Sequence, residues 1–285
     1  MRRIEGVALV LVLMVVGVLS LLLLQLSLTA RQQVKRAQQV LDRSEAVLRL
    51  HSIEAAIRFE LLTRPWALDP NREGGMRVSN LWNFRGIPFE FVGATVCLQD
   101  VAGLIPLPAQ RGDLSEFTRL LSVLGMTDDR VALAVQRLRS HMDSSGWMPL
   151  QSAAELAIIM SLTSDEMARL NKISTLYPST AFNPLTAPAS VLATRYSTSA
   201  IEAVEALRTQ GQLDETTFSA ATGVQFDDFI VANPGPVVRV DIRVLKGESI
   251  ARRQTVWRLE PRSMEPLVLW SARSPAEGEG DPCRT

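Results

Sequence analysis

The 285-residue chain has few of the side chains that catalysis and metal binding usually need. It contains two histidines and two cysteines, and it lacks the sequence signatures of P-loops, dinucleotide folds, nucleophile elbows and zinc proteases. Its 30 basic and 30 acidic residues cancel, without a basic tract or an acidic block. This composition argues against a nucleic-acid-binding protein, a disordered acidic tail and a disulfide-rich scaffold.

The few candidate reactive side chains have ordinary structural interpretations. His51 lies on the apolar face of a predicted helix as a packed residue, and His141 ends another helix, where a cation is favoured. Cys97 lies in a predicted strand without a nearby base, which favours a core residue over a nucleophile. Cys97 and Cys283 could pair in an oxidising compartment, but their sequence separation does not decide this. We therefore predict that the protein is not an enzyme and has no catalytic residues.

One long apolar run dominates the N-terminal part of the chain. Residues 7–28 contain no charged side chain and would form a helix of roughly 33 Å, enough to cross a hydrocarbon core of about 30 Å. A cleaved secretory signal usually has a shorter apolar core and small residues before its cleavage site, whereas Leu28 is large. We predict a transmembrane helix at 7–28; basic residues on both sides of it leave its orientation open.

Residues 29–63 continue this helix as a predicted amphipathic stem, and Pro65 ends it. Apolar side chains recur at alternating steps of three and four, the pattern of one helix face. The predicted stripe consists of Val34, Ala37, Leu41, Ser44, Leu48, His51, Ala55, Phe59 and Leu62. The simpler interpretation of this arrangement is a membrane anchor with a coiled-coil spacer, and the more specific one is the spine of a pilin.

In the rest of the chain, strand patterns lie before and after a helical segment, and we predict that these strands form one sheet. Segments 64–110 and 233–275 alternate apolar and polar residues, as strands with one buried face do, and residues 88–100 among them read as one strand. Residues 276–285 look like a loose tail.

Helix signals fill the segment between these strands, residues 111–232. Capping-box pairs begin at Ser152 and Thr163, each followed by an apolar run. The predicted fold class is therefore α+β: a long N-terminal helix packed on an antiparallel sheet, with a large all-helical domain inserted between the strands.

Three passages make this chain resemble the K-type minor pseudopilins of bacterial type II secretion systems. Residues 5–9 (EGVAL) are similar to the family's prepilin-peptidase site. Residues 182–188 (FNPLTAP) resemble an asparagine-rich turn before a helix, and the closing hairpin ends in Leu269-Trp270. The resemblance covers nearly the whole chain and implies a pilin-like fold.

The resemblance implies that residues 1–6 are a leader, cut after Gly6 to leave a methylated Val7. Most pilins carry a glutamate at the fifth position after the cut, where it is thought to pair with a neighbouring N-terminus. K-type members lack this glutamate and are placed at the pseudopilus tip, and this chain has Leu11 there. A carboxylate in lipid is costly without a partner, so a subunit without that neighbour does not need one.

The implied function is to cap the pseudopilus tip and support export of folded periplasmic proteins across the outer membrane. The implied partners are the I- and J-type minor pseudopilins, the major pseudopilin, the prepilin peptidase and the inner membrane, with no nucleic acid. The C-terminal part would lie in the periplasm behind a single membrane span. The expected contact surface, shared between partner helices and the protein's own sheet, is Leu41, Leu48, Ala55 and Phe59.

Calcium is the point at which the chain departs from the family. Members described as binding calcium use an acidic loop, and the matching residues 138–147 contain one acidic residue, Asp143. Calcium prefers six to eight oxygen ligands, usually including several carboxylates. We therefore predict no metal and no cofactor.

Two other functions remain open from the sequence. A periplasmic binding module on an uncleaved signal anchor would keep an intact N-terminus. A membrane-anchored hydrolase would need clustered catalytic residues, which the sequence does not display.

Overall fold

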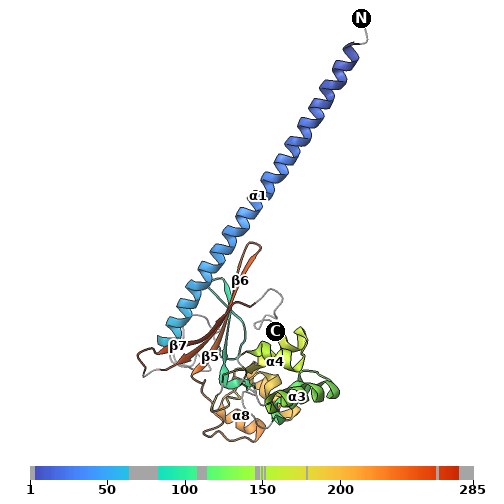
Figure 1. The fold of residues 1–285 in the computed structure, drawn as a ribbon. Coiled ribbons are helices and arrows are strands. Elements are labelled where there is room, and N and C mark those ends of the chain that lie inside the picture. The colour runs from blue at the N-terminus through green and yellow to red at the C-terminus, as the bar shows by residue number, and fades with distance from the viewer. Residues whose placement is uncertain are drawn as a thin grey trace. The chain divides into compact units, whose positions relative to one another are not determined.

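The computed structural model describes residues 4–63, 83–107, 114–144, 148, 150, 152–177, 179–260 and 263–275, with side chains from Leu11 onward (Figure 1). The chain forms two compact units. The first contains the residues up to Arg49 together with Val244–Ala251, and the second contains Leu50–Arg243 and the residues after Ala251. Pro65, the predicted strand segment before Asn83 and the predicted tail 276–285 lie outside the described residues.

Helix α1 (Ile4–Thr63) is uninterrupted over 60 residues, as the absence of a helix breaker predicts. Its N-terminal part is long and apolar enough to cross a membrane by length and composition. The large apolar side chains from Leu11 to Leu28 are exposed, which a lipid environment would satisfy.

In the second unit, the end of α1 packs against the sheet through a face other than the predicted stripe. The buried positions on this part of the helix are Leu50, Ile53, Ile57 and Leu61. The stripe side chains Leu41, Leu48, Ala55 and Phe59 are exposed instead. For Ala55 and Phe59, which belong to the second unit, the expectation that they pack on the protein's own sheet is therefore wrong, while the contact with partner helices stays a prediction. The stem carries apolar residues on two sides, and periodicity alone does not tell which side the sheet covers.

Among the described residues, the sheet has five strands in the order β1-β2-β5-β6-β7. β1 pairs antiparallel with β2, and β6 pairs antiparallel with β7, with a register shift between Val256 and Trp257. The strands are β1 (Phe89–Phe91), β2 (Ala94–Asp100), β5 (Val237–Lys246), β6 (Ser249–Leu259) and β7 (Leu267–Arg273). Strands from before and after the insertion share one sheet, as predicted. Residues 88–100, however, form a hairpin rather than one strand, because the chain turns at Val92-Gly93 with positive φ at both residues.

Short helices around one apolar core form the insertion, whose largest fully buried side chains include Leu120, Leu138, Leu156 and Phe218. Thr163 and Glu166 make both hydrogen bonds of a capping box, and Ser152 accepts a hydrogen bond from the Glu155 N–H. The helices are α2 (Ser115–Val123), α3 (Asp128–Asp143), α4 (Ala153–Met160), α5 (Ser164–Ile173), α6 (Ala189–Leu192), α7 (Thr198–Thr209) and α8 (Glu215–Thr222). The 3₁₀ turn η1 (Val101–Gly103) leads from β2 into the insertion, and a parallel pair, β3 (Ile105–Pro106) with β4 (Ser174–Thr175), lies inside it. The α+β fold class is thus confirmed.

Candidate functional site

In the first unit, the tip of the β5–β6 hairpin contacts the stem. Lys246 Nζ lies 2.8 Å from Glu45 Oε2, and Lys35 Nζ lies 3.8 Å from Glu248 Oε2. Gly247 has a φ of 55° and lies so close to Asp42 that a Cβ would collide with its carboxylate. Exposed ion pairs stabilise little, so these two charge pairs contribute little to the contact.

The predicted assembly residues form an exposed apolar surface on α1. Leu41 is 53% exposed and Leu48 is 68% exposed in the first unit, and Phe59 is 63% exposed in the second. Leu11, in the apolar run, is also exposed. Gly6 and Val7 are part of α1, but their side chains lie outside the description. A contact surface for another helix must be exposed to its surroundings, and the side chains of Leu41, Leu48 and Phe59 are largely exposed.

His51 does not have the packed position that its place in the stripe predicts. Its side chain is 54% exposed, and Nδ1 lies 3.8 Å from Glu54 Oε2. Glu54 is buried and pairs with Arg253 Nε at 3.0 Å. Arg58 lies over the Trp257 ring with 4.7 Å between the guanidinium carbon and the ring centroid. These contacts hold the end of α1 on β6.

A buried carboxylate organises the junction between the sheet and the insertion. Asp100, at the end of β2, accepts hydrogen bonds through Oδ1 from the N–H groups of Ala102 (3.0 Å) and Gly235 (3.1 Å). Through Oδ2 it accepts from Asn183 Nδ2 (3.0 Å) and Thr186 Oγ1 (2.9 Å). Burial raises the pKa of Asp100 to about 6, although all four donors act to lower it.

The predicted FNPLTAP turn is thus placed by its own polar side chains. Asn183 donates its second amide hydrogen to the Asn233 carbonyl at 2.9 Å, and its Oδ1 accepts from the Leu185 N–H at 3.1 Å. Gly103 packs so tightly on Thr186 that a Cβ would lie 2.7 Å from Oγ1 and 2.8 Å from the backbone carbon. The sequence pointed to the turn but not to Asp100, because a single aspartate at a strand end has no distinguishing pattern.

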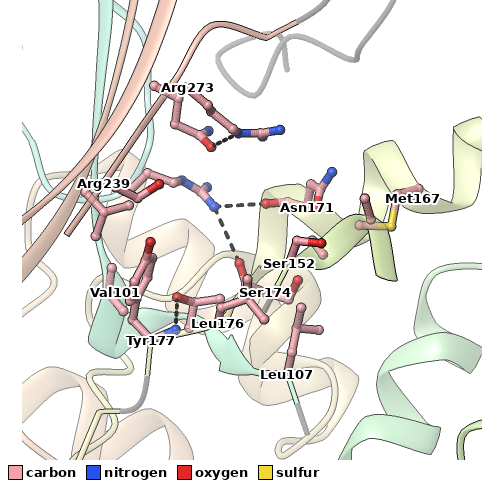
Figure 2. A pocket seen from close by; sticks show the side chains of 16 residues that line it. Val101, Leu107, Ser152, Met167, Asn171, Ser174, Leu176, Tyr177, Arg239 and Arg273 are labelled. Atoms are coloured by element: carbon pink, nitrogen blue, oxygen red, sulfur yellow. Dashed lines mark hydrogen bonds between the residues drawn. The ribbon is translucent and has the colours of Figure 1, made fainter. Parts of the chain in front are cut away.

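A cavity with a volume of about 300 Å³ lies between the sheet and the insertion, within the second unit. Figure 2 shows the side chains that line it. Arg239 projects from β5 and donates to the carbonyls of Asn171 and Lys172, both at 2.9 Å, at the C-terminal end of α5. Its Nε lies 3.5 Å from Asp241 Oδ2. Arg273 of β7 donates from Nε to Gln254 Oε1 at 2.7 Å. No motif marked these residues, since tertiary packing alone brings them together.

The remaining candidates concern metals and thiols. Among the described residues, no group of three or more His, Cys, Asp or Glu side chains could hold a metal ion. Asp143 is the last residue of α3, while 145–147 of the matching loop lie outside the described residues. Cys97 is buried and disulfide-bonded. Cys283, the other cysteine in the sequence, is also outside the description.

No protein-family model and no curated protein matches the chain. Among solved structures, it is similar to a chain in the crystal structure of the GspK–GspI–GspJ complex from the type 2 secretion system of enterotoxigenic Escherichia coli. The two are 13% identical, with a TM-score of 0.49, over 85% of this chain and 99% of that chain.

Proposed function

We propose that the chain is a K-type minor pseudopilin of a bacterial type II secretion system. It is held in the inner membrane by α1, with its folded part in the periplasm, and it assembles with I- and J-type minor pseudopilins. The observation that carries this proposal is that different parts and faces of α1 have different surroundings. One helix continues from an apolar run into a stem with two apolar faces, and the protein's own sheet covers one of them.

The second apolar face supplies the energy for assembly in this proposal. Burying a leucine or phenylalanine side chain contributes roughly 1.5–3 kcal/mol, so a few such residues are enough to bind a partner helix. Leu41, Leu48 and Phe59 lie on this face and remain largely exposed. The opposite face, with Leu50 and Ile57, is already used within the chain.

The tip position rests on two further features. Leu11 replaces the glutamate that would pair with a neighbouring N-terminus, and an uncompensated carboxylate in lipid would be costly. The insertion, with seven helices in its described residues, makes the folded part larger than a sheet-and-helix subunit needs to be. Both features suit a single copy that ends the filament. In this proposal the filament supports the export of folded proteins across the outer membrane.

N-terminal mass spectrometry of the membrane-extracted protein tests this assignment. Prepilin-peptidase processing would give a chain that begins at methylated Val7, and Gly6→Val would block the cut. A chain that retains its first six residues in the presence of the peptidase would contradict the proposal and favour the signal-anchored binding module.

A matched pair of variants tests the assembly surface. Leu48 is 68% exposed and Leu50 is 4% exposed, although they lie two residues apart. Leu48→Asp is expected to leave folding intact and to abolish co-purification with the I- and J-type partners. Leu50→Asp is expected to destabilise the fold itself, since it buries a charge against the sheet. Normal partner binding by Leu48→Asp would exclude this face as the interface.

A further inference from the structure

The part of α1 that follows the apolar run carries only positive charge. Arg31, Lys35 and Arg36 are exposed, and residues 7–41 include no aspartate or glutamate. Lys35 has an ionic contact, at 3.8 Å from its Nζ to the exposed carboxylate of Glu248. Arg31 and Arg36 have no acidic partner among the described residues of the chain. Their charges therefore remain available to a partner outside the chain.

The three side chains lie at the depth of the lipid headgroups when residues 7–28 cross the hydrocarbon core. At about 1.5 Å per residue, Arg31 lies about 4–5 Å beyond Leu28, and Arg36 lies about 12 Å beyond it. The headgroup layer extends about 5–8 Å beyond the hydrocarbon on each side. Side chains of a helix tilt towards its N-terminus, which is the direction of the membrane here. Long basic side chains also extend along an apolar surface until their charge is solvated, so all three reach the headgroup phosphates.

The distribution of charge about the span is unusual for the proposed topology. Basic residues beside a membrane span are normally concentrated on its cytoplasmic side. Arg2 and Arg3 precede the apolar run in the sequence, but the proposed cut after Gly6 would remove both. The processed chain would then keep basic side chains beside the span only on the periplasmic side. Anionic headgroups on that side would give these residues the counter-charge that the chain itself lacks.

We propose that Arg31, Lys35 and Arg36 form a basic collar that binds anionic phospholipid headgroups, such as phosphatidylglycerol, on the C-terminal side of the span. The basic collar fixes the depth of α1 in the bilayer before assembly. It leaves the apolar assembly face available, because Arg36 lies about 140° around the helix from Leu41. This inference rests on the membrane anchor proposed above, but not on the identity of the protein partners.

The experiment reconstitutes the full chain in vesicles that contain equal amounts of phosphatidylcholine and phosphatidylglycerol. Bilayer discs around the protein are cut out with a styrene–maleic acid polymer and purified, and their lipids are quantified by mass spectrometry. The ratio of phosphatidylglycerol to phosphatidylcholine should be at least about twofold higher in the discs than in the vesicles, since each basic residue near the surface favours an anionic lipid. Salt at about 1 M should abolish this enrichment, because it shortens the Debye length to about 3 Å. Wild-type discs with the lipid ratio of the vesicles would overturn the proposal.

Matched variants test the depth of the basic collar. Arg36 and Arg43 are both exposed and lie seven positions apart, so they share one face of α1. Arg43 lies about 22 Å beyond Leu28, outside the headgroup layer. Arg36→Gln should reduce the enrichment, and adding Arg31→Gln should bring the ratio close to that of the vesicles, whereas Arg43→Gln should keep the wild-type value. An equal loss in Arg36→Gln and Arg43→Gln would refute the assignment to headgroup depth.

Flotation with vesicles of phosphatidylcholine alone separates the basic collar from the membrane anchor itself. A chain that floats with these vesicles but does not enrich phosphatidylglycerol overturns only the basic collar, and a chain that does not float overturns the anchor as well. If Arg36→Gln loses the I- and J-type partners while the lipid ratio stays unchanged, the basic residues contact protein instead. That result would also overturn the proposal.

Discussion

Replacing Asp100 by asparagine separates two opposing effects at the buried junction. The carboxylate receives four hydrogen bonds, which favour its ionised form, but burial disfavours the charge and raises the pKa to about 6. Asparagine has nearly the same shape and is uncharged at every pH. Its oxygen can keep the hydrogen bonds from the Ala102 and Gly235 N–H groups, but its NH2 group donates two hydrogens and accepts none, so the bond from Asn183 Nδ2 is lost. Thr186 can adapt to either, because its hydroxyl lies 3.2 Å from the Asn183 carbonyl as well as 2.9 Å from Asp100. Asp100→Asn should therefore lose the Asn183 hydrogen bond at every pH but, like a permanently protonated Asp100, should not titrate.

The pKa difference gives the size and the sign of the effect. The folded-state pKa, about 6, is higher than the ordinary value of 3.8, so the folded protein holds this proton more tightly than the unfolded chain. The stabilisation is complete below pH 3.8 and is lost as the pH rises through 6. The shift corresponds to about 3 kcal/mol in total, of which about 2 kcal/mol is lost between about pH 4.5 and about pH 8.

The assay is urea unfolding of the full chain in detergent, followed by tryptophan fluorescence, at several pH values across this interval. The free energy of unfolding of Asp100→Asn minus that of the wild type should rise by about 2 kcal/mol between about pH 4.5 and about pH 8. Asp228→Asn, at an exposed site in the same unit, serves as the control. If this difference instead falls as the pH rises, the four hydrogen bonds outweigh burial in setting the pKa of Asp100. That result would refute the reasoning.

Two further substitutions test local features of the backbone. Val92 has a φ of 50° in the β1–β2 turn, where a β-branched residue is strained, so Val92→Asn should raise the free energy of unfolding by about 1 kcal/mol in the same urea assay; a loss of stability would mean that the valine side chain makes a stabilising contact. Gly103→Ala would push a Cβ against the backbone of Thr186 and Ala187 and should lower that free energy by about 1–3 kcal/mol. An unchanged value for Gly103→Ala would show that η1 can move away from the turn.

Local patterns predicted those parts of the fold that local interactions determine. The continuous helix follows from a stretch without a breaker, and the capping box at Thr163 follows from two residues three positions apart. The face of the stem that packs on the sheet was not identified, because Leu48 and Leu50 are chemically equivalent in the sequence. Only the position of the sheet distinguishes them, and that depends on contacts between distant segments.

The candidate site shows the same limit more sharply. Asp100 finds its partners 83 residues away at Asn183 and 135 residues away at Gly235. Each of these residues is unremarkable within its own segment. The turn that contains Asn183 could be recognised from a family resemblance, whereas the cavity with Arg239 and Arg273 could not, because its residues come from five or more separate elements.

Two buried polar contacts join the inserted domain to the sheet within the second unit. At one side, Asp100 binds both the turn at Asn183 and the chain that returns to β5 at Gly235. At the other, Arg239 of β5 donates to the last carbonyls of α5, where a positive charge also complements the helix dipole. Because there are two separate contacts, the insertion cannot rotate against the sheet about one of them without breaking the other. In the proposed role, force applied to the insertion would therefore pass to the sheet rather than bend the junction.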